Sequence, residues 1–288
     1  MTFATRSPST RSAGAGSAAA SDTKMTNAAS RLLVAVAALP VVLGAVYVGG
    51  WWLFALVMVG ALVALHEYWL LTRRLSPLSP AGYVGAVLAL VGAQLGGVTW
   101  MVGGILTAFP LAFLLKGISA SRQAPTASIS ATVMGALWVG GGLGFVLLVR
   151  DLERGRLATF ALLIAVWAGD TLAYFGGRLV GRHKMAPDTS PGKTWEGFVF
   201  GTIATIFAAF VTLYDARDTY LSIGQAVAFG AVIAVAAPLG DLFESMLKRD
   251  AGVKDTGRLL GGHGGMLDRI DAILFAAPAA YFTLLALT

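Results

Sequence analysis

The stretch WWLFALVMVGALVALHEYWLL, residues 51–71, decides the fold class, because it is apolar except at His66 and Glu67 near its end. A run of about 20 apolar residues is long enough to cross the hydrocarbon core of a bilayer as a helix. The rest of the chain is similar: 57% of its residues are hydrophobic and only 12% are charged, against about 25% charged residues in soluble domains. We therefore predict an all-α, polytopic integral membrane protein.

Working outward from this stretch, nine apolar runs follow one another along the chain: 32–49, 51–71, 81–97, 98–115, 129–149, 157–180, 195–214, 222–247 and 270–287. The third and fourth runs share a tight turn at Gly96-Gly97. Four prolines lie inside runs, where they are expected to kink membrane helices rather than end them: Pro40, Pro110, Pro238 and Pro278. Residues 1–30 are rich in Ser, Ala and Thr without hydrophobic periodicity, which predicts a disordered tail.

The distribution of basic residues predicts the orientation, because cytoplasmic loops of membrane proteins carry an excess of Lys and Arg. With the N-terminus in the cytoplasm, 17 of the 21 basic residues lie inside. The other four lie outside: Arg150, Arg154, Arg156 and Arg217. We expect a cytoplasmic N-terminus, an external C-terminus and a location in the inner (plasma) membrane. Basic loops of this kind favour anionic lipids and nucleotide phosphates as partners, and not nucleic acid.

Charge also divides the chain into three parts. Beyond the tail, residues 31–150 are nearly free of charge within the runs and predict a transmembrane scaffold region. Residues 151–288 hold a dense set of polar groups from Gly169 onward and predict the region that carries the chemistry. The chain contains no Cys, which excludes disulfides and thiolate metal sites.

The richest segment is GDLFESMLKRDAGVKDTGRLLGGHGGMLDRID, residues 240–271. Helical spacing places four of its polar residues on one face: Asp241, Glu244, Ser245 and Lys248. Asp268 and Asp271 lie three residues apart at the entrance of the last run. The four acids of the segment are expected to converge on a hard divalent cation such as Mg²⁺, which prefers carboxylate oxygens: Asp241, Glu244, Asp268 and Asp271. The alternative is that the charges form salt bridges at the membrane interface.

A glycine-rich sequence surrounds His263 in the same segment. Gly264 and Gly265 follow His263, and Gly261 and Gly262 precede it. Glycine permits close approach of the backbone to a phosphate. Salt bridges alone do not require such a sequence, so it favours a functional site.

Residues 190–197, SPGKTWEG, precede the seventh run. A Ser or Thr N-cap followed by Pro at the first helical position is a helix start signal, and a helix N-terminus suits phosphate binding. Ser190, Lys193 and Thr194 are therefore candidate phosphate ligands, with Lys193 adding a full charge. The alternative is an ordinary helix cap with Trp195 as an interfacial anchor.

Asp170 lies inside the sixth run. A carboxylate at this depth is by default a functional-site hypothesis. The alternative is a structural role, in which Asp170 accepts a hydrogen bond from Tyr174 or pairs with Arg178, both on the same helical face.

The segments 245–249 (SMLKR), Lys254-Asp255 and 263–271 (HGGMLDRID) resemble, with their spacing, the signature of the phosphatidate cytidylyltransferases. The resemblance covers residues 160–288 strongly and residues 31–150 only as a pattern of runs. Two positions depart from it: Gly192, where relatives often have a second lysine, and Gly262, where proline is common. The first departure puts one phosphate contact in doubt.

The resemblance implies that CTP and phosphatidic acid form CDP-diacylglycerol and pyrophosphate at the cytoplasmic face, and it favours a homodimer. It implies one or two Mg²⁺ ions, with a monovalent cation left open, and these metal ligands: Asp241, Glu244, Asp268 and Asp271. The implied catalytic residues are Asp241, Asp268, His263 and Lys248. The implied substrate-binding residues are Asp170, Ser190, Lys193, Thr194, Ser245, Arg249, Lys254, Gly264, Gly265 and Arg269.

Three rival functions are weighed against this interpretation. A CTP-dependent polyprenol kinase would transfer the γ-phosphate to a lipid alcohol, and the long signature at 263–271 argues against it. A CDP-alcohol phosphotransferase would carry the pattern Asp-Gly…Ala-Arg…Gly…Asp…Asp, which the sequence lacks. An ion-coupled transporter would be expected to show repeat symmetry with charges in both halves, whereas the first half here is nearly charge-free.

Overall fold

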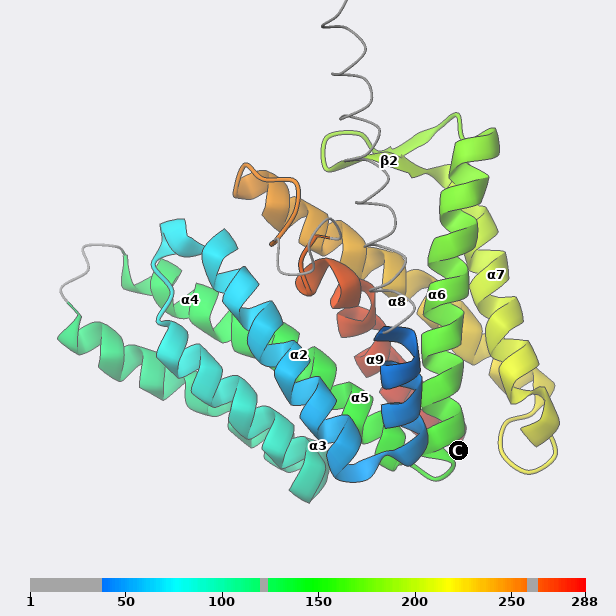
Figure 1. Cartoon of the computed structure of the whole chain (residues 1–288), viewed down its shortest axis with the longest axis horizontal. Coiled ribbons are helices and arrows are strands. Elements are labelled where there is room, and N and C mark those ends of the chain that lie inside the picture. The colour runs from blue at the N-terminus through cyan, green and yellow to red at the C-terminus, as the bar shows by residue number, and fades with distance from the viewer. Residues whose placement is uncertain (1–37, 120–123, 258–263) are drawn as a thin grey trace, which may run out of the picture.

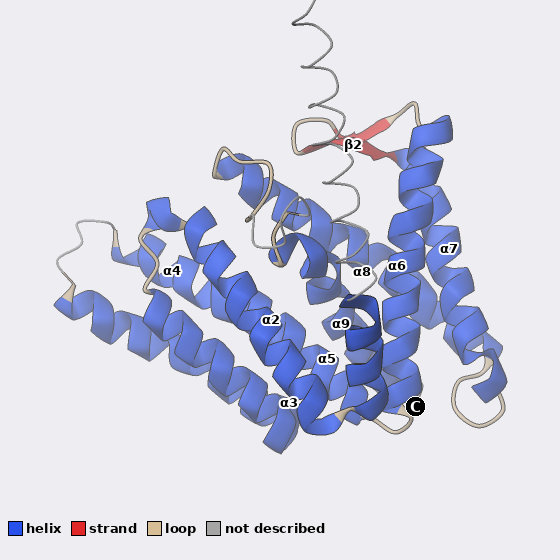
Figure 2. Cartoon of the chain, viewed as in Figure 1, coloured by secondary structure: helices blue, strands red, loops and turns tan. Residues whose placement is uncertain are grey.

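Helices dominate the computed structural model, which describes residues 38–119, 124–257 and 264–288 (Figure 2). The strands in these ranges are β1 (Lys184–Ala186) and β2 (Ser190–Thr194), which pair as a short antiparallel ribbon. The prediction of an all-α membrane protein is confirmed, with this ribbon as its addition. The predicted tail at 1–30 and His263 lie outside the described residues.

Seven helices in the described ranges are long and apolar enough to cross a membrane. They are α2 (Gly50–Leu71), α3 (Ser79–Ile118), the continuous helix of α4 (Pro125–Gly135), η2 (Ala136–Gly141) and α5 (Gly142–Asp151), then α6 (Gly155–Val180), α7 (Trp195–Leu213), α8 (Ile223–Asp250) and α9 (Leu267–Leu287). A shorter apolar helix spans Ala38–Val48, and two short 3₁₀ turns, η1 (Arg73–Leu75) and η3 (Tyr214–Ala216), follow α2 and α7. The number of nine spans and the sides on which the termini lie stay predictions.

Helix α3 contains the predicted glycine turn. Gly97 has a φ of 70°, which breaks the helix into two halves and is a conformation that glycine adopts without strain. A Cβ atom on Gly85 would lie 2.6 Å from the Cβ of Ala108, and one on Gly92 would lie 2.5 Å from the backbone of Trp100. The two halves therefore fold back on each other as an antiparallel hairpin.

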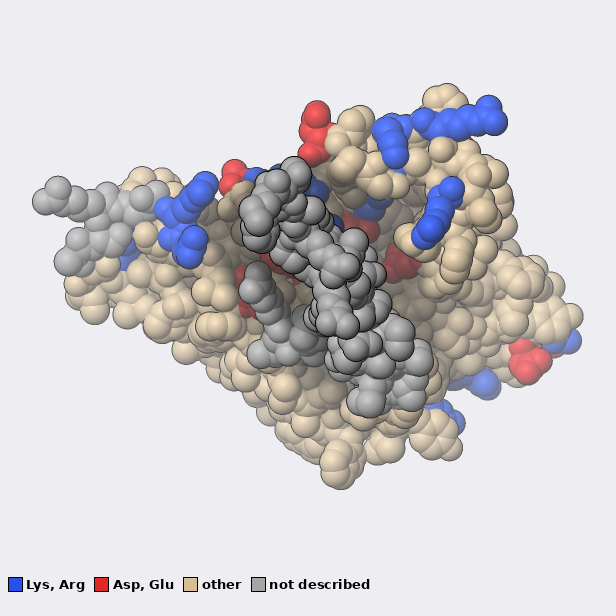
Figure 3. Space-filling view, turned by 45° about the horizontal axis from the view of Figure 1, so that its top comes forward, with Lys and Arg blue, Asp and Glu red and all other residues tan. Residues whose placement is uncertain are grey.

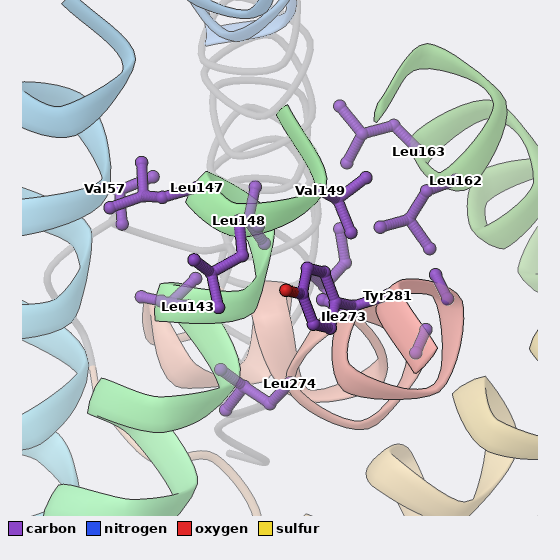
Figure 4. Close-up of a cluster of buried hydrophobic side chains, with 14 of the residues drawn as sticks. Val57, Leu143, Leu147, Leu148, Val149, Leu162, Leu163, Ile273, Leu274 and Tyr281 are labelled. Atoms are coloured by element: carbon purple, nitrogen blue, oxygen red, sulfur yellow. The ribbon is translucent and has the colours of Figure 1, made fainter. Parts of the chain in front are cut away.

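The helices form two groups that meet at α5 and α9 (Figure 1). Helices α6, α7 and α8 pack beside one another on one side, and α2, α3 and α4 lie on the other. Buried aliphatic residues join the groups, among them Leu147 of α5, Leu162 of α6 and Leu274 of α9 (Figure 4). The packing fixes α9 against both α5 and α8, which sets the position of the acids at its start.

Large apolar side chains cover much of the outside of these helices. Trp52 is 73% exposed, Leu106 is 64% exposed and Phe207 is 63% exposed. Exposed apolar surface on this scale is expected where lipid replaces water as the solvent, because lipid chains are themselves apolar. Helices are suited to this solvent, since they satisfy their own backbone groups. The surface therefore fits the polytopic membrane fold.

The predicted helix start at Ser190-Pro191 is wrong. Ser190 begins strand β2, and α7 begins only at Trp195. Thr194 is the N-cap, and its side-chain oxygen accepts a hydrogen bond from the backbone N–H of Gly197 at 3.1 Å. The hairpin with β1 holds residues 190–194 extended, so the helical signal of the Ser-Pro pair is overridden by strand pairing.

Candidate active site

A cavity of about 660 Å³ opens between α6, α7, α8, the start of α9 and the β1–β2 ribbon. Its volume lies within the range of about 300–1,000 Å³ that is usual for small-molecule sites. The charged residues that line it include Asp170, Lys193, Asp241, Glu244, Lys248, Asp268 and Asp271. Figure 3 shows acidic atoms inside a hollow of this surface with basic atoms around it.

Three carboxylates form the acidic centre of the cavity. Asp241, Glu244 and Asp271 each offer an oxygen atom, and these atoms all lie within 4.8 Å of one another. Asp241 and Glu244 lie one turn apart on α8, and Asp271 comes from α9. The helices approach closely because Gly240 has no side chain: a Cβ there would collide with the backbone oxygen of Asp271. We call Asp241, Glu244 and Asp271 the acid trio.

The acid trio fits a hard divalent cation. Glu244 is 1% exposed, and its Oε1 atom has no hydrogen-bond partner within the part of the chain that the structure describes. Three carboxylates at this spacing repel one another, and burial increases the cost of each charge. Oxygen ligands of this type are those that Mg²⁺ and similar ions prefer. A cation would both balance the charge and use the remaining oxygen of Glu244.

Lys248 links the acid trio to Asp268. Its Nζ atom lies 2.6 Å from Oε2 of Glu244 and 2.7 Å from Oδ1 of Asp268. The other oxygen of Asp268, Oδ2, accepts hydrogen bonds from the backbone N–H of Gly265 at 2.7 Å and of Thr256 at 3.1 Å. Asp268, predicted as a fourth metal ligand, thus lies beside the acid trio and is held by a cation of the protein.

Lys193 reaches the acid trio from the ribbon. Its Nζ atom lies 2.8 Å from Oδ2 of Asp241 and 3.4 Å from the backbone oxygen of Pro238. Ser245 donates a hydrogen bond to Oδ1 of Asp241 at 3.4 Å. Strand β2 therefore directs the side chain of Lys193, the predicted phosphate ligand that precedes the N-cap Thr194, to the acid trio.

Other predicted residues lie at the edge of this arrangement. Ser190 and Thr194 line the cavity, and Gly264 lies next to Asp268. Arg249 donates to the backbone oxygen of Thr189 at 3.0 Å. Two further predicted ligands, Lys254 and Arg269, are exposed and do not line the cavity.

Asp170 lines the cavity on α6, together with Lys193 and Asp241. The structural alternative gave Asp170 a partner in Tyr174 or Arg178. Arg178 instead donates to the hydroxyl of Tyr174 at 3.0 Å, and both residues line the same cavity. The geometry therefore places the Asp170 carboxylate with the charged groups of the cavity.

Glu67 of α2 is a functional candidate that the sequence interpretation missed. It is 3% exposed, and its carboxylate accepts hydrogen bonds from the backbone N–H groups of Met266 at 3.0 Å and Leu267 at 2.8 Å. The sequence carried one signal for it, a lone carboxylate inside an apolar run. Helix α2 thus reaches the segment that bears Asp268.

Comparisons with known proteins agree with this chemistry. The pattern of the cytidylyltransferase family matches residues 29–287. A phosphatidate cytidylyltransferase of Mycobacterium bovis is 37% identical over 254 residues, covering 80% of this chain and 79% of the relative. One from Staphylococcus haemolyticus is 33% identical, covering 86% and 95%, and one from Synechocystis is 31% identical, covering 88% and 94%.

Proposed function

The chain belongs to the cytidylyltransferase family, and on this premise we infer that it is a phosphatidate cytidylyltransferase. It joins CTP and phosphatidic acid to form CDP-diacylglycerol and pyrophosphate. The observation that carries the proposal is the acid trio, with Lys193 and Lys248 beside it, in one cavity of a membrane protein. This arrangement of acids and cations suits the handling of phosphate groups next to lipid.

The reaction consists of one substitution at the α-phosphorus of CTP. A phosphate oxygen of phosphatidic acid forms a bond to that phosphorus, and the bond to the oxygen that bridges to the β-phosphate breaks, so that pyrophosphate leaves. The second pKa of a phosphate monoester is about 6, so the attacking oxygen is largely ionised at neutral pH and no side chain has to remove its proton. The protein has to align the two substrates and neutralise their charge.

Asp241, Glu244 and Asp271 are the residues that we propose hold Mg²⁺, and Asp268 stays a proposed ligand that would have to exchange Lys248 for the ion. When bound, such an ion supplies Lewis-acid neutralisation of phosphate charge. Because the acids then have another cation as partner, Lys193 and Lys248 are free to bind phosphate oxygens. Lysine suits this role as a mobile point charge.

The remaining proposed ligands surround this centre. Asp170 and the ribbon residues Ser190 and Thr194 face the nucleotide in the cavity. A hydroxyl, basic side chains and backbone groups bind the phosphates: Ser245, Arg249, Lys254, Gly264, Gly265 and Arg269. His263 would orient a phosphate. Three further features stay proposals: a homodimer, a location in the inner membrane, and the division into a scaffold and a catalytic region.

We expect the cavity to face the cytoplasm, because CTP arrives from there. The natural chain has no Cys, so single-cysteine variants report orientation cleanly. Asp188 in the ribbon turn and Asp218 after α7 are both exposed and flank opposite ends of α7. A membrane-impermeant maleimide should label Asp218→Cys in intact cells and Asp188→Cys only after permeabilisation. The reverse pattern would overturn the orientation.

Position-specific labels on CTP separate the proposal from the polyprenol kinase. With phosphatidic acid as acceptor, label on the α-phosphate should appear in lipid and label on the γ-phosphate should appear in pyrophosphate. A kinase acting on a polyprenol would give the opposite result, since only the γ-label would enter lipid. If a polyprenol is labelled from γ-labelled CTP and no lipid is labelled from α-labelled CTP, the protein is a polyprenol kinase and the proposed function is wrong.

A further inference from the structure

The carboxylate of Glu67 lies far from the acid trio in sequence but ends at the segment that carries Asp268. Helix α2 brings it there, where it is 3% exposed. Its Oε1 accepts from the backbone N–H of Met266 and its Oε2 from that of Leu267, at 3.0 and 2.8 Å. These are N–H groups at the start of α9, which have no partner within the helix itself, and the positive end of the helix dipole favours a carboxylate there.

Thr256 joins Glu67 to Asp268. Its hydroxyl lies 2.9 Å from Oδ2 of Asp268 and 3.2 Å from Oε2 of Glu67, and its backbone N–H donates to the same oxygen of Asp268 at 3.1 Å. A hydroxyl has one hydrogen to donate, so Thr256 can serve only one of the two carboxylates at a time. The loop at 256 is thus tied to both acids.

Two glycines, Gly257 and Gly265, make room for the Glu67 carboxylate because they have no side chain. A Cβ atom on Gly265 would collide with Oε2 of Glu67 and with Oγ1 of Thr256, and one on Gly257 would lie 2.5 Å from Oε1 of Glu67. Gly257 and Gly265 therefore both approach the Glu67 carboxylate too closely to carry a side chain. Through Gly265, whose N–H donates to Asp268, this contact reaches the Lys248 ion pair.

We propose that Glu67 is a positioning residue of the active site, which fixes the start of α9 and so sets Asp268 and Asp271 against α8. The proposal rests on the proposed function for its catalytic readout. Asp271 lies one turn beyond Asp268, so rotation or displacement of the α9 start moves it out of the acid trio. The hydrogen bonds of Glu67 among the described residues go to Thr256, Met266 and Leu267 and not to the acid trio, so its proposed effect on a bound ion is indirect.

The test is Glu67→Gln, with His66→Gln as the matched control. Gln offers one oxygen and places an NH₂ group against a backbone N–H of α9, so one of the two hydrogen bonds is lost. The side chain of His66 is exposed and precedes Glu67 on the same helix. We expect the Mg²⁺ concentration for half-maximal transfer to rise about tenfold or more in Glu67→Gln, and less than about twofold in the control.

A second readout needs no turnover. Mg²⁺ should raise the thermal unfolding midpoint of the purified wild-type protein in detergent, and a tenfold higher Mg²⁺ concentration should be needed for the same rise in Glu67→Gln. The two proposals can fail separately. If the variant needs the higher Mg²⁺ concentration but neither the wild type nor the variant transfers the cytidylyl group, the positioning role stands and the proposed cytidylyltransferase function is overturned. An unchanged Mg²⁺ requirement together with a lower midpoint would mean that Glu67 only stabilises the fold.

Thr256→Val keeps the test valid if Glu67→Gln does not fold. The change removes only the bridging hydroxyl, retains the backbone hydrogen bond to Asp268, and alters little volume at this buried position. We expect the Mg²⁺ requirement to rise about threefold, since one of the links around Glu67 is lost. A requirement equal to that of the wild type would overturn the proposed link.

Discussion

Replacement of Asp241 by Asn is expected to lower the rate of cytidylyl transfer about a thousandfold, the upper range for loss of one preorganised charged or polar group in an active site. Asp241 is one of the acid trio, and its oxygens also contact Lys193 and Ser245. An amide in its place removes one negative charge at the proposed ion. The loss should therefore be in turnover, measured as labelled lipid formed per minute by purified protein with saturating CTP.

The change should leave the fold intact, because the side chain of Asp241 is 38% exposed. Asp218→Asn is the matched control: it neutralises an acid whose side chain is 79% exposed beyond the far end of α7. We expect the control to keep its activity and both variants to keep the wild-type unfolding midpoint. Transfer by Asp241→Asn within a few fold of the control would remove Asp241 from the metal site.

Replacement of Lys248 by Met is expected to abolish transfer and to reduce stability by about 3 kcal/mol or more, because removing one partner of a buried ion pair leaves an uncompensated charge. Lys248 is 14% exposed and Glu244 is 1% exposed. Without the ammonium group, Glu244 and Asp268 both lose their cation. The measurement is the thermal unfolding midpoint in detergent without divalent ions, with Lys184→Met as an exposed control for stability alone.

The double variant Lys248→Met/Glu244→Gln separates stability from catalysis. It neutralises the more buried of the two acids, so much of the lost stability should return, while transfer stays abolished because a trio ligand and a phosphate ligand are both gone. Failure of the double variant to regain stability, or a single variant as stable as the wild type, would contradict the role of Lys248 as the partner of Glu244.

Much of the fold follows from local patterns. Apolar length alone predicted α7 at 195–214, where the helix spans Trp195–Leu213. The positive φ of Gly97 agrees with the predicted turn. Helical spacing also placed Asp241 and Glu244 on one face, because that relation depends only on the period of the helix.

The rest of the site depends on contacts between distant segments. The bond from Leu267 to Glu67 joins residues 200 positions apart, and no local period reports such a pair. Ser190 carried a helix signal that the pairing of β2 with β1 overrode. The pairing of Asp268 with Lys248 likewise depends on how α8 and α9 pack, so no local pattern predicted it.

The most direct test of cytidylyl transfer at a metal-dependent site uses purified protein, phosphatidic acid and CTP labelled on the α-phosphate. With Mg²⁺, one unlabelled pyrophosphate should form for each labelled lipid, and the formation of both should cease with EDTA and return when Mg²⁺ is restored. Equal formation of both products in EDTA would contradict the metal site. No labelled lipid with Mg²⁺, under conditions in which a known cytidylyltransferase is active, would contradict the function itself.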